Sequence, residues 1–287
     1  MTRTHLSALQ HATVQLSSIS DSPRLDAEVL LREVTGLDRV GLLLRFAELL
    51  PDEQGATFNA LIERRRAGEP VAYIIGRRGF RSIELAVDER VLIPRPDTEW
   101  IVDLALTWLA QHRGPRRVVD VGTGSGAIAL ALASELDAGR SDVQIVGVDV
   151  SRDALAVARL NRERLELQRR VDLVAGDLLS AISGSFDLIL ANLPYLRPGQ
   201  MHPSTDREPR LALFAGPDGF SLYRELLRQA AALLTPDGML VGEIDPAQAE
   251  LAVDVAQQTM GRAAVVRRDL AGDARYLIVG DTGVLQR

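Results

Sequence analysis

The run Asn192-Leu193-Pro194-Tyr195 follows an apolar stretch at 186–191 and brings together an amide, a constrained carbonyl and an aromatic ring. An asparagine side chain can pair with another primary amide through both halves, because its oxygen accepts an N–H and its NH2 donates to a C=O. Pro194 restricts Leu193 to extended geometry, which aims the Leu193 carbonyl at the same target. Tyr195 supplies a flat face for stacking. The run therefore predicts a catalytic site for an amide-bearing group, although Asn and Pro are also common in simple turns.

A second candidate site is the turn Gly122-Thr123-Gly124-Ser125-Gly126, which lies between an apolar run and a helical pattern. Glycines let the backbone approach a ligand closely and expose amide N–H groups at a helix start. The spacing Gly-x-Gly-x-Gly differs from the Gly-x-Gly-x-x-Gly of dinucleotide sites, so it gives less reason to expect a pyrophosphate. A nucleoside with an amino-acid tail, S-adenosylmethionine, fits better. The alternative is a tight structural turn without a ligand.

Acidic residues follow the next two expected strands. Asp149 ends the strand after the glycine turn, about 20 residues beyond the last glycine, an interval typical of an acid that binds ribose hydroxyls. Asp177, followed by Leu178, ends the third strand and either binds the adenine edge or starts the next helix. We therefore predict a cofactor site formed by the glycine turn, Asp149, Asp177, Leu178 and Asn192.

The elements that must position these residues alternate between strands and helices from residue 116 onward. Strands are expected at 118–121, 145–148, 171–175, 186–191 and 239–244 and near Val265 and Leu277, and helices at 127–136, 153–167, 221–234 and 247–260. Apolar strands separated by helices indicate a parallel sheet covered on both faces. The last two strands have a short connection, which suggests an antiparallel pair at one edge. We predict an α/β protein with a Rossmann-like seven-stranded sheet.

The first seventy residues predict a small helical domain. Pro23 is typical of a helix start and Gly36 of a helix end, and Leu25, Val29 and Leu30 are expected to face inward between them. A further helix should run from about residue 52 to residue 68, and 70–76 reads as a short apolar strand. A hairpin is expected at 80–87, and the prolines of 91–96 exclude a helix there. The resulting division is a helical domain at 1–75, a hairpin and linker at 76–98, and the sheet domain at 99–287.

Composition excludes several classes of protein. All 33 basic residues are arginine, so lysine Schiff-base chemistry is excluded, and the absence of cysteine excludes disulfides and thiolate metal sites. The four histidines lack paired ligand spacing, so we expect no metal. The net charge of −6 does not suit a duplex nucleic-acid binder; the short arginine clusters are most simply solvated, with docking to an RNA-associated partner as the alternative. Without a membrane span or a signal-peptide core, we expect a soluble, cytoplasmic protein.

The two sites together resemble those of the amino-methyltransferases, whose signature is Asn/Asp-Pro-Pro-Tyr. The chain is most similar to the release-factor glutamine N5-methyltransferases, and the similar segments extend over nearly its whole length. These segments are 23–28, 68–76, 92–99, 122–130 and 208–219, of which Ile93 to Glu99 is the most diagnostic. The resemblance implies an S-adenosylmethionine-dependent methyltransferase sheet, N-terminal helices that hold a peptide chain release factor, and a target glutamine in a Gly-Gly-Gln loop. We expect the protein to act as a monomer.

One residue departs from the family pattern, since Leu193 replaces a proline. The carbonyl that the family uses to bind the target nitrogen remains, while Leu193 adds a backbone N–H. This departure bears on catalytic efficiency more than on substrate identity. Two other functions stay open at this point: a DNA or RNA amino-methyltransferase, which would need a basic track for a flipped base, and a non-catalytic S-adenosylmethionine-binding module. A nicotinamide dehydrogenase would require the other glycine spacing.

Overall fold

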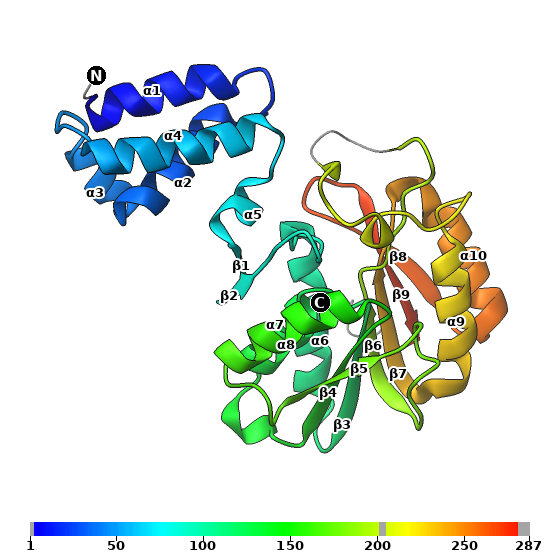
Figure 1. Cartoon of the computed structure of the whole chain (residues 1–287). Helices are drawn as coiled ribbons and strands as arrows, with labels where there is room; N and C mark the ends of the chain where they lie inside the picture. The colour runs from blue at the N-terminus through cyan, green and yellow to red at the C-terminus, as the bar shows by residue number, and fades with distance from the viewer. Residues whose placement is uncertain (1–2, 201–204, 281–287) are drawn as a thin grey trace. The chain divides into compact units, whose positions relative to one another are not determined.

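The computed structural model describes residues 3–200 and 205–280, and the chain forms two compact units (Figure 1). The first unit comprises the chain up to Arg77 together with the segment that ends at Arg207. The second comprises Arg78–Met201 and Glu208–Arg287. Among the residues that the structure describes, no helix combines the length and the apolar character needed to cross a membrane.

The first unit is helical. Its elements are α1 (His5–Leu16), α2 (Pro23–Thr35), α3 (Arg39–Leu44), α4 (Asp52–Arg66) and α5 (Val71–Ile75). Apolar side chains of α1, α2 and α4, among them Leu9, Leu30 and Phe58, are buried together in its core. Helix α2 begins at Pro23 and ends at Gly36, whose φ of 67° lies in the left-handed region that favours glycine. The predicted helical character of this segment is confirmed.

Two local predictions in this unit were wrong. The segment 70–76 is not a strand but contains the short helix α5, in which the N–H groups of Tyr73 and Ile74 both donate to the Pro70 carbonyl. A short apolar run has too few residues to distinguish a buried helical turn from a strand by periodicity. In α2, Leu30 is buried as predicted, whereas Leu25 is 54% exposed and Val29 half-buried, because Ala27 and Leu31 form the rest of the buried apolar face.

The second unit contains the predicted seven-stranded sheet. Its strands are β3 (Arg116–Val121), β4 (Val143–Asp149), β5 (Val171–Ala175), β6 (Phe186–Ala191), β7 (Leu234–Glu243), β8 (Ala264–Arg268) and β9 (Ala274–Gly280), in the order β5-β4-β3-β6-β7-β9-β8. The pairs from β5 to β7 are parallel, while β9 pairs antiparallel with both β7 and β8. The expected antiparallel pair at one edge is therefore confirmed.

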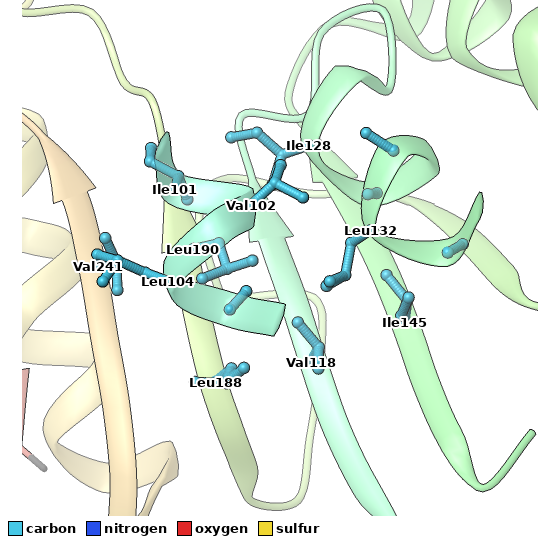
Figure 2. Packing of buried hydrophobic residues seen from close by; sticks show 14 of the residues in the cluster. Ile101, Val102, Leu104, Val118, Ile128, Leu132, Ile145, Leu188, Leu190 and Val241 are labelled. Carbon is cyan, nitrogen blue, oxygen red and sulfur yellow. The ribbon is translucent and has the colours of Figure 1, made fainter. Parts of the chain in front are cut away.

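Helices cover both faces of this sheet because successive strand residues point to opposite sides. Helices α6 (Glu99–Gln111) and α7 (Ala127–Glu135) pack on the face that carries Val118, Leu188 and Leu190 (Figure 2). Helices α9 (Ser221–Leu233) and α10 (Ala249–Met260) pack on the opposite face, together with Val119 and Ile189. Helix α8 (Arg152–Arg164) contacts β5. The buried sheet thus holds the carboxyl ends of its strands in fixed positions.

The expected hairpin also belongs to the second unit. Strands β1 (Arg77–Phe80) and β2 (Ile83–Ala86) form a separate two-stranded sheet, and Phe80, Ile83 and Leu85 join the core beneath α6 and α7. The proline-rich segment after it is extended and leads into the short 3-10 helix η1 (Pro96–Thr98), directly before α6.

Candidate active site

A cavity of about 280 Å³ opens in the second unit where β3, β4, β5 and β6 end. In open parallel sheets, ligands bind at this carboxyl edge. The cavity brings together eight of the predicted site residues, namely Gly122, Gly124, Asp149, Asp177, Leu178, Asn192, Leu193 and Pro194. The other predicted residues, Thr123, Ser125, Gly126 and Tyr195, do not line it, and their contacts give them supporting positions.

The glycine turn is built for close approach. Gly122, Gly124 and Gly126 all have positive φ, at 73°, 55° and 86°. A Cβ atom at Gly122 would lie 2.9 Å from the Leu193 side chain, so any larger residue there would disturb the run at 192–195. The N–H of Gly122 donates to the carbonyl of Val148 at 2.8 Å, which ties the turn to the end of β4.

Beneath the turn lies Asp120, which the sequence reasoning did not single out. Its Oδ2 accepts from the hydroxyl of Thr123 at 2.6 Å and from the N–H of Ala129 at 3.2 Å. Burial raises the pKa of Asp120 to about 7, although these two hydrogen bonds act in the opposite direction. Thr123 thus points into the protein and anchors the turn instead of facing the cavity.

Asp149 lies at the end of β4 and accepts from two backbone N–H groups. One oxygen binds the N–H of Gly124 at 2.9 Å and the other binds the N–H of Ser151 at 2.8 Å. Burial raises the pKa of this carboxyl, against the effect of the same hydrogen bonds. Asp149 therefore joins the glycine turn to the start of α8 while its remaining lone pairs are open to a hydroxyl donor.

Asp177 and Leu178 form the cavity wall after β5. No helix starts at Asp177: residues 178–181 form a turn, which removes one of the two interpretations of this acid. Leu178 has a φ of 52°, a conformation that is rare for a branched side chain, and the side chain is buried. Such backbone strain is concentrated at ligand sites in proteins.

Asn192 directly follows β6 and is held from behind. Its Nδ2 donates to Oγ1 of Thr98 at 2.8 Å, and the Thr98 hydroxyl donates to Oε2 of Glu243, the last residue of β7, at 2.8 Å. Thr98 and Glu243 are both buried. One N–H of Asn192 is thus used inside the protein, so the predicted two-sided pairing with a target amide has only the second N–H available. Thr98 lies in the diagnostic stretch 93–99, and Glu243 is the acid at the end of an apolar strand.

The side chain of Leu193 is buried and packs against Gly122. Its backbone acts on the nearby hydroxyl of Tyr223, where it lowers the pKa of the phenol against the larger, opposite effect of burial. That hydroxyl in turn donates to the carbonyl of Glu243 at 2.5 Å. Burial raises the pKa of the half-buried Tyr195 to about 12, which keeps its phenol neutral.

A further wall of the cavity comes from the segment after Glu208, which the sequence analysis named only as part of the family resemblance. Pro209, Leu211 and Ala212 line the cavity. The preceding Glu208 is buried, accepts from the N–H of Ile93 at 3.3 Å and pairs with Arg95. Burial raises the pKa of Glu208, and Arg95 acts in the opposite direction.

The residues present suit a nucleoside with a cationic tail. The cavity combines the apolar surfaces of Leu178, Leu193 and Leu222 with the carboxyl groups of Asp149 and Asp177. The lining residue Arg90 is paired with Asp88. Within the described ranges, no group of three or more acidic or histidine side chains could hold a metal ion.

Two sequence families match the chain. Residues 7–76 match the family described as the PrmC N-terminal domain, and residues 114–274 match one described as a methyltransferase domain. The release factor glutamine methyltransferase of Rhodopirellula baltica is 40% identical over 268 residues, covering 90% of this chain and 89% of the relative. The protein of that name from Deinococcus radiodurans is also 40% identical, covering 94% of this chain and 95% of the relative.

Solved structures share the fold of this chain over most of its length. A methyltransferase from Pyrococcus furiosus has a TM-score of 0.52 at 19% identity and covers 77% of this chain and 96% of its own. A 16S rRNA methyltransferase from T. thermophilus, in complex with AdoMet and guanosine, has a TM-score of 0.50 at 18% identity and covers 71% and 49% of the two chains. At such identities the likeness concerns the fold alone. The predicted methyltransferase sheet with its N-terminal helical domain is confirmed.

Proposed function

Because the chain belongs to the release factor glutamine methyltransferase family, we propose that it methylates the glutamine of the Gly-Gly-Gln motif in peptide chain release factors. In this reaction the methyl group leaves the sulfonium of S-adenosylmethionine, which becomes a neutral thioether, and bonds to the side-chain amide nitrogen, N5. The nitrogen then releases one of its two protons to solvent. The observation that carries this proposal is the opening of an amide-binding motif and a glycine turn into one cavity, where Asn192, Leu193 and Gly122 line the same space.

The cofactor side of the cavity is formed by the glycine turn, Asp149, Asp177 and Leu178. When bound, S-adenosylmethionine supplies an electrophilic methyl group on a sulfonium ion. In this proposal Asp149 accepts from ribose hydroxyls; the lone pairs that its carboxylate retains beyond its two backbone bonds support this role. Leu178 offers an apolar surface for the base, and Asp177 an acceptor for its exocyclic amine.

The substrate side must make an amide nitrogen reactive. That nitrogen is a weak nucleophile because its lone pair is delocalised into the carbonyl. Two acceptors, Oδ1 of Asn192 and the backbone carbonyl of Leu193, bind its two hydrogens and favour the positive charge that develops on nitrogen. Acceptors held in place before the reaction stabilise such charge without reorganisation. Pro194 keeps the Leu193 carbonyl extended.

The partner assignments complete the proposal. We propose that the N-terminal helices bind the release factor and that the protein acts as a cytoplasmic monomer without contacting nucleic acid directly. The net charge of −6 supports the last point, because nucleic-acid affinity depends on counterion release by basic side chains. Passage through a heparin column at low salt is the expected result, and retention would favour a nucleic-acid substrate.

Peptide mass spectrometry tests the activity directly. A purified release factor is incubated with this protein and S-adenosylmethionine and then digested. The Gly-Gly-Gln peptide is expected to gain the mass of one methyl group in place of a hydrogen, with fragment ions that place it on the glutamine. An unmodified peptide, with cofactor binding confirmed separately by calorimetry, would contradict the proposal and favour the non-catalytic binding module.

A further inference from the structure

We infer that Glu243 and Thr98 are positioning residues that orient the amide of Asn192 through a hydrogen-bond chain with a fixed direction. The inference rests on the proposed function, since it concerns how the same site presents an acceptor to the target nitrogen. Neither residue lines the cavity, so both act on the reaction only through Asn192.

The chain joins three separate elements. Glu243 ends β7, Thr98 ends η1, and Asn192 follows β6. Both links measure 2.8 Å between donor and acceptor atoms. Strands β6 and β7 are neighbours in register, with Ala191 opposite Gly242, so the two ends of the chain project from adjacent strand ends.

The direction follows from counting protons. An ionised carboxylate only accepts hydrogen bonds, so the single hydroxyl proton of Thr98 is donated to Glu243. Oγ1 of Thr98 then has only lone pairs left for Asn192, and the group that faces it must be the NH2. The Asn192 oxygen is consequently turned toward the cavity. Reversing the amide would set Oδ1 against the lone pairs of Thr98 and present NH2, a donor, to the target NH2.

The backbone of Thr98 is held by contacts that do not involve its hydroxyl. The hydroxyl of Tyr276 donates to the carbonyl of Asp97 at 2.7 Å, and the ring of Tyr276 stacks on Trp100 with centroids 4.3 Å apart. Replacing only the hydroxyl of Thr98 should therefore leave η1 in place. The isosteric variant Thr98→Val therefore tests the orientation of the Asn192 amide without displacing η1.

Protonation of Glu243 removes the fixed direction of this hydrogen-bond chain. The protonated acid can donate to Thr98, whose own proton then becomes available to the Asn192 oxygen. Burial raises the pKa of Glu243, while the Thr98 hydrogen bond and the nearby Arg275 and Arg95 oppose this shift. The charged and phenolic groups that face Glu243 from the neighbouring elements are Arg275, Arg95, Asp97, Tyr195, Tyr223 and Tyr276. The turnover number should accordingly fall as the pH is lowered. The fall should begin above the pH range in which a glutamate usually titrates.

The test compares three proteins in release-factor methylation: wild type, Thr98→Val and Thr98→Ser. Thr98→Val is expected to lower kcat about tenfold, the upper range for loss of one neutral hydrogen bond, with an unchanged Kd for S-adenosylmethionine. Thr98→Ser keeps the hydroxyl and should restore kcat. The acid limb of kcat should be present in wild type and Thr98→Ser and absent in Thr98→Val. A Thr98→Val enzyme with wild-type kcat, or one that loses cofactor affinity to the same extent as kcat, overturns the inference.

A second variant covers the case in which Thr98→Val does not fold. Glu243→Gln retains an acceptor oxygen but cannot take up a proton, so the acid limb is expected to disappear. Persistence of that limb in Glu243→Gln would contradict the inference.

An activity-independent readout separates this inference from the proposed function. The side-chain ¹H–¹⁵N signals of Asn192, identified by their loss in Asn192→Ala, should shift with pH in wild type and Thr98→Ser but not in Thr98→Val. If the pH dependence of these signals is the same in all three proteins, the hydrogen-bond chain is contradicted even when methylation is observed. If the Asn192 signals depend on pH as expected but the release factor remains unmethylated, the proposed function alone is contradicted.

Discussion

Asn192 presents an oxygen to the cavity and uses one N–H within the protein. Its contribution is thus expected in the transition state, where charge on the target nitrogen develops, and not in the binding of S-adenosylmethionine. This distinction gives a measurable separation between rate and affinity.

Asn192→Ala should lower kcat for methylation by roughly 100- to 1,000-fold, similar to the loss of one preorganised hydrogen-bonding group at a charge-developing centre. The Kd for S-adenosylmethionine, measured by calorimetry, should remain close to that of wild type. Equal losses in both quantities would contradict the assigned role. Exposed Gln258→Ala, which removes a surface amide from α10 of the second unit, serves as the control.

Asp120 is the buried acid that supports the glycine turn, and its charge affects stability. Its pKa rises from 3.8 to about 7 on folding, chiefly because of burial. The folded state therefore binds the proton more tightly than the unfolded state. The contribution of Asp120 to the free energy of unfolding is fully present below the unfolded pKa of 3.8 and is lost as the pH rises from there through about 7.

Asp120→Asn should remove this dependence, because the amide is neutral at every pH. Relative to wild type, the free energy of unfolding of the variant is expected to increase by a few kcal/mol, about 1.4 per pKa unit, between pH 5 and pH 8. Urea denaturation at the two pH values measures this difference. Parallel curves for the two proteins would contradict it. Exposed Asp254→Asn controls for the change in net charge.

At the scale of elements, one asparagine connects the hairpin, α8 and the glycine turn. Asn161 on α8 is buried, accepts from the N–H of Ala86 at 2.7 Å and donates to the carbonyls of Ala86 at 3.0 Å and Ser125 at 2.9 Å. The backbone of Ser125 thus contributes to the site by being fixed, although its side chain is away from the cavity.

Asn161→Ala should destabilise the protein by about 3 kcal/mol, because it leaves buried backbone groups without partners and creates a small cavity. It should also weaken binding of S-adenosylmethionine, since the glycine turn loses a support. Denaturant unfolding and calorimetry measure the two effects. Exposed Arg159→Ala on the same helix should change neither, and wild-type stability in Asn161→Ala would contradict this account.

At the scale of the whole molecule, the chain combines a helical unit with a methyltransferase unit. The cavity and its walls lie entirely in the second unit, between Arg90 and Leu222. The N-terminal helices are therefore not needed to form the cavity, which is consistent with their proposed role in binding the release factor.

A short peptide that contains Gly-Gly-Gln should be a much poorer substrate than the folded release factor. We expect kcat/KM to be lower by at least about 100-fold, because binding energy from remote contacts is unavailable to the truncated substrate. Steady-state kinetics with both substrates provide the measurement, and Asn192→Ala should impair both. Similar kcat/KM values would contradict a substrate-binding role for the first unit.

The sequence by itself determined the sheet and the position of its ligand edge. The apolar strands are long enough to be recognised, and the glycine turn, Asp149, Asp177 and Asn192 each follow one of them. Since parallel strands end at the same edge, their order in the chain predicted that these residues would meet. The short segment 70–76 and the inward positions of Leu25 and Val29 in α2 were misassigned because the local pattern there carries too little information.

Only the tertiary structure decided which way the side chains near these strand ends point and what they bind. Thr123 turns inward to Asp120, whereas Thr98 and Glu243, 145 residues apart in the chain, meet behind Asn192. The hydroxyl of Tyr223 on α9 likewise donates to the carbonyl of Glu243 at the end of β7. Such contacts depend on burial and on the direction of single hydrogen bonds between distant segments, and neither is encoded in the local spacing of residues.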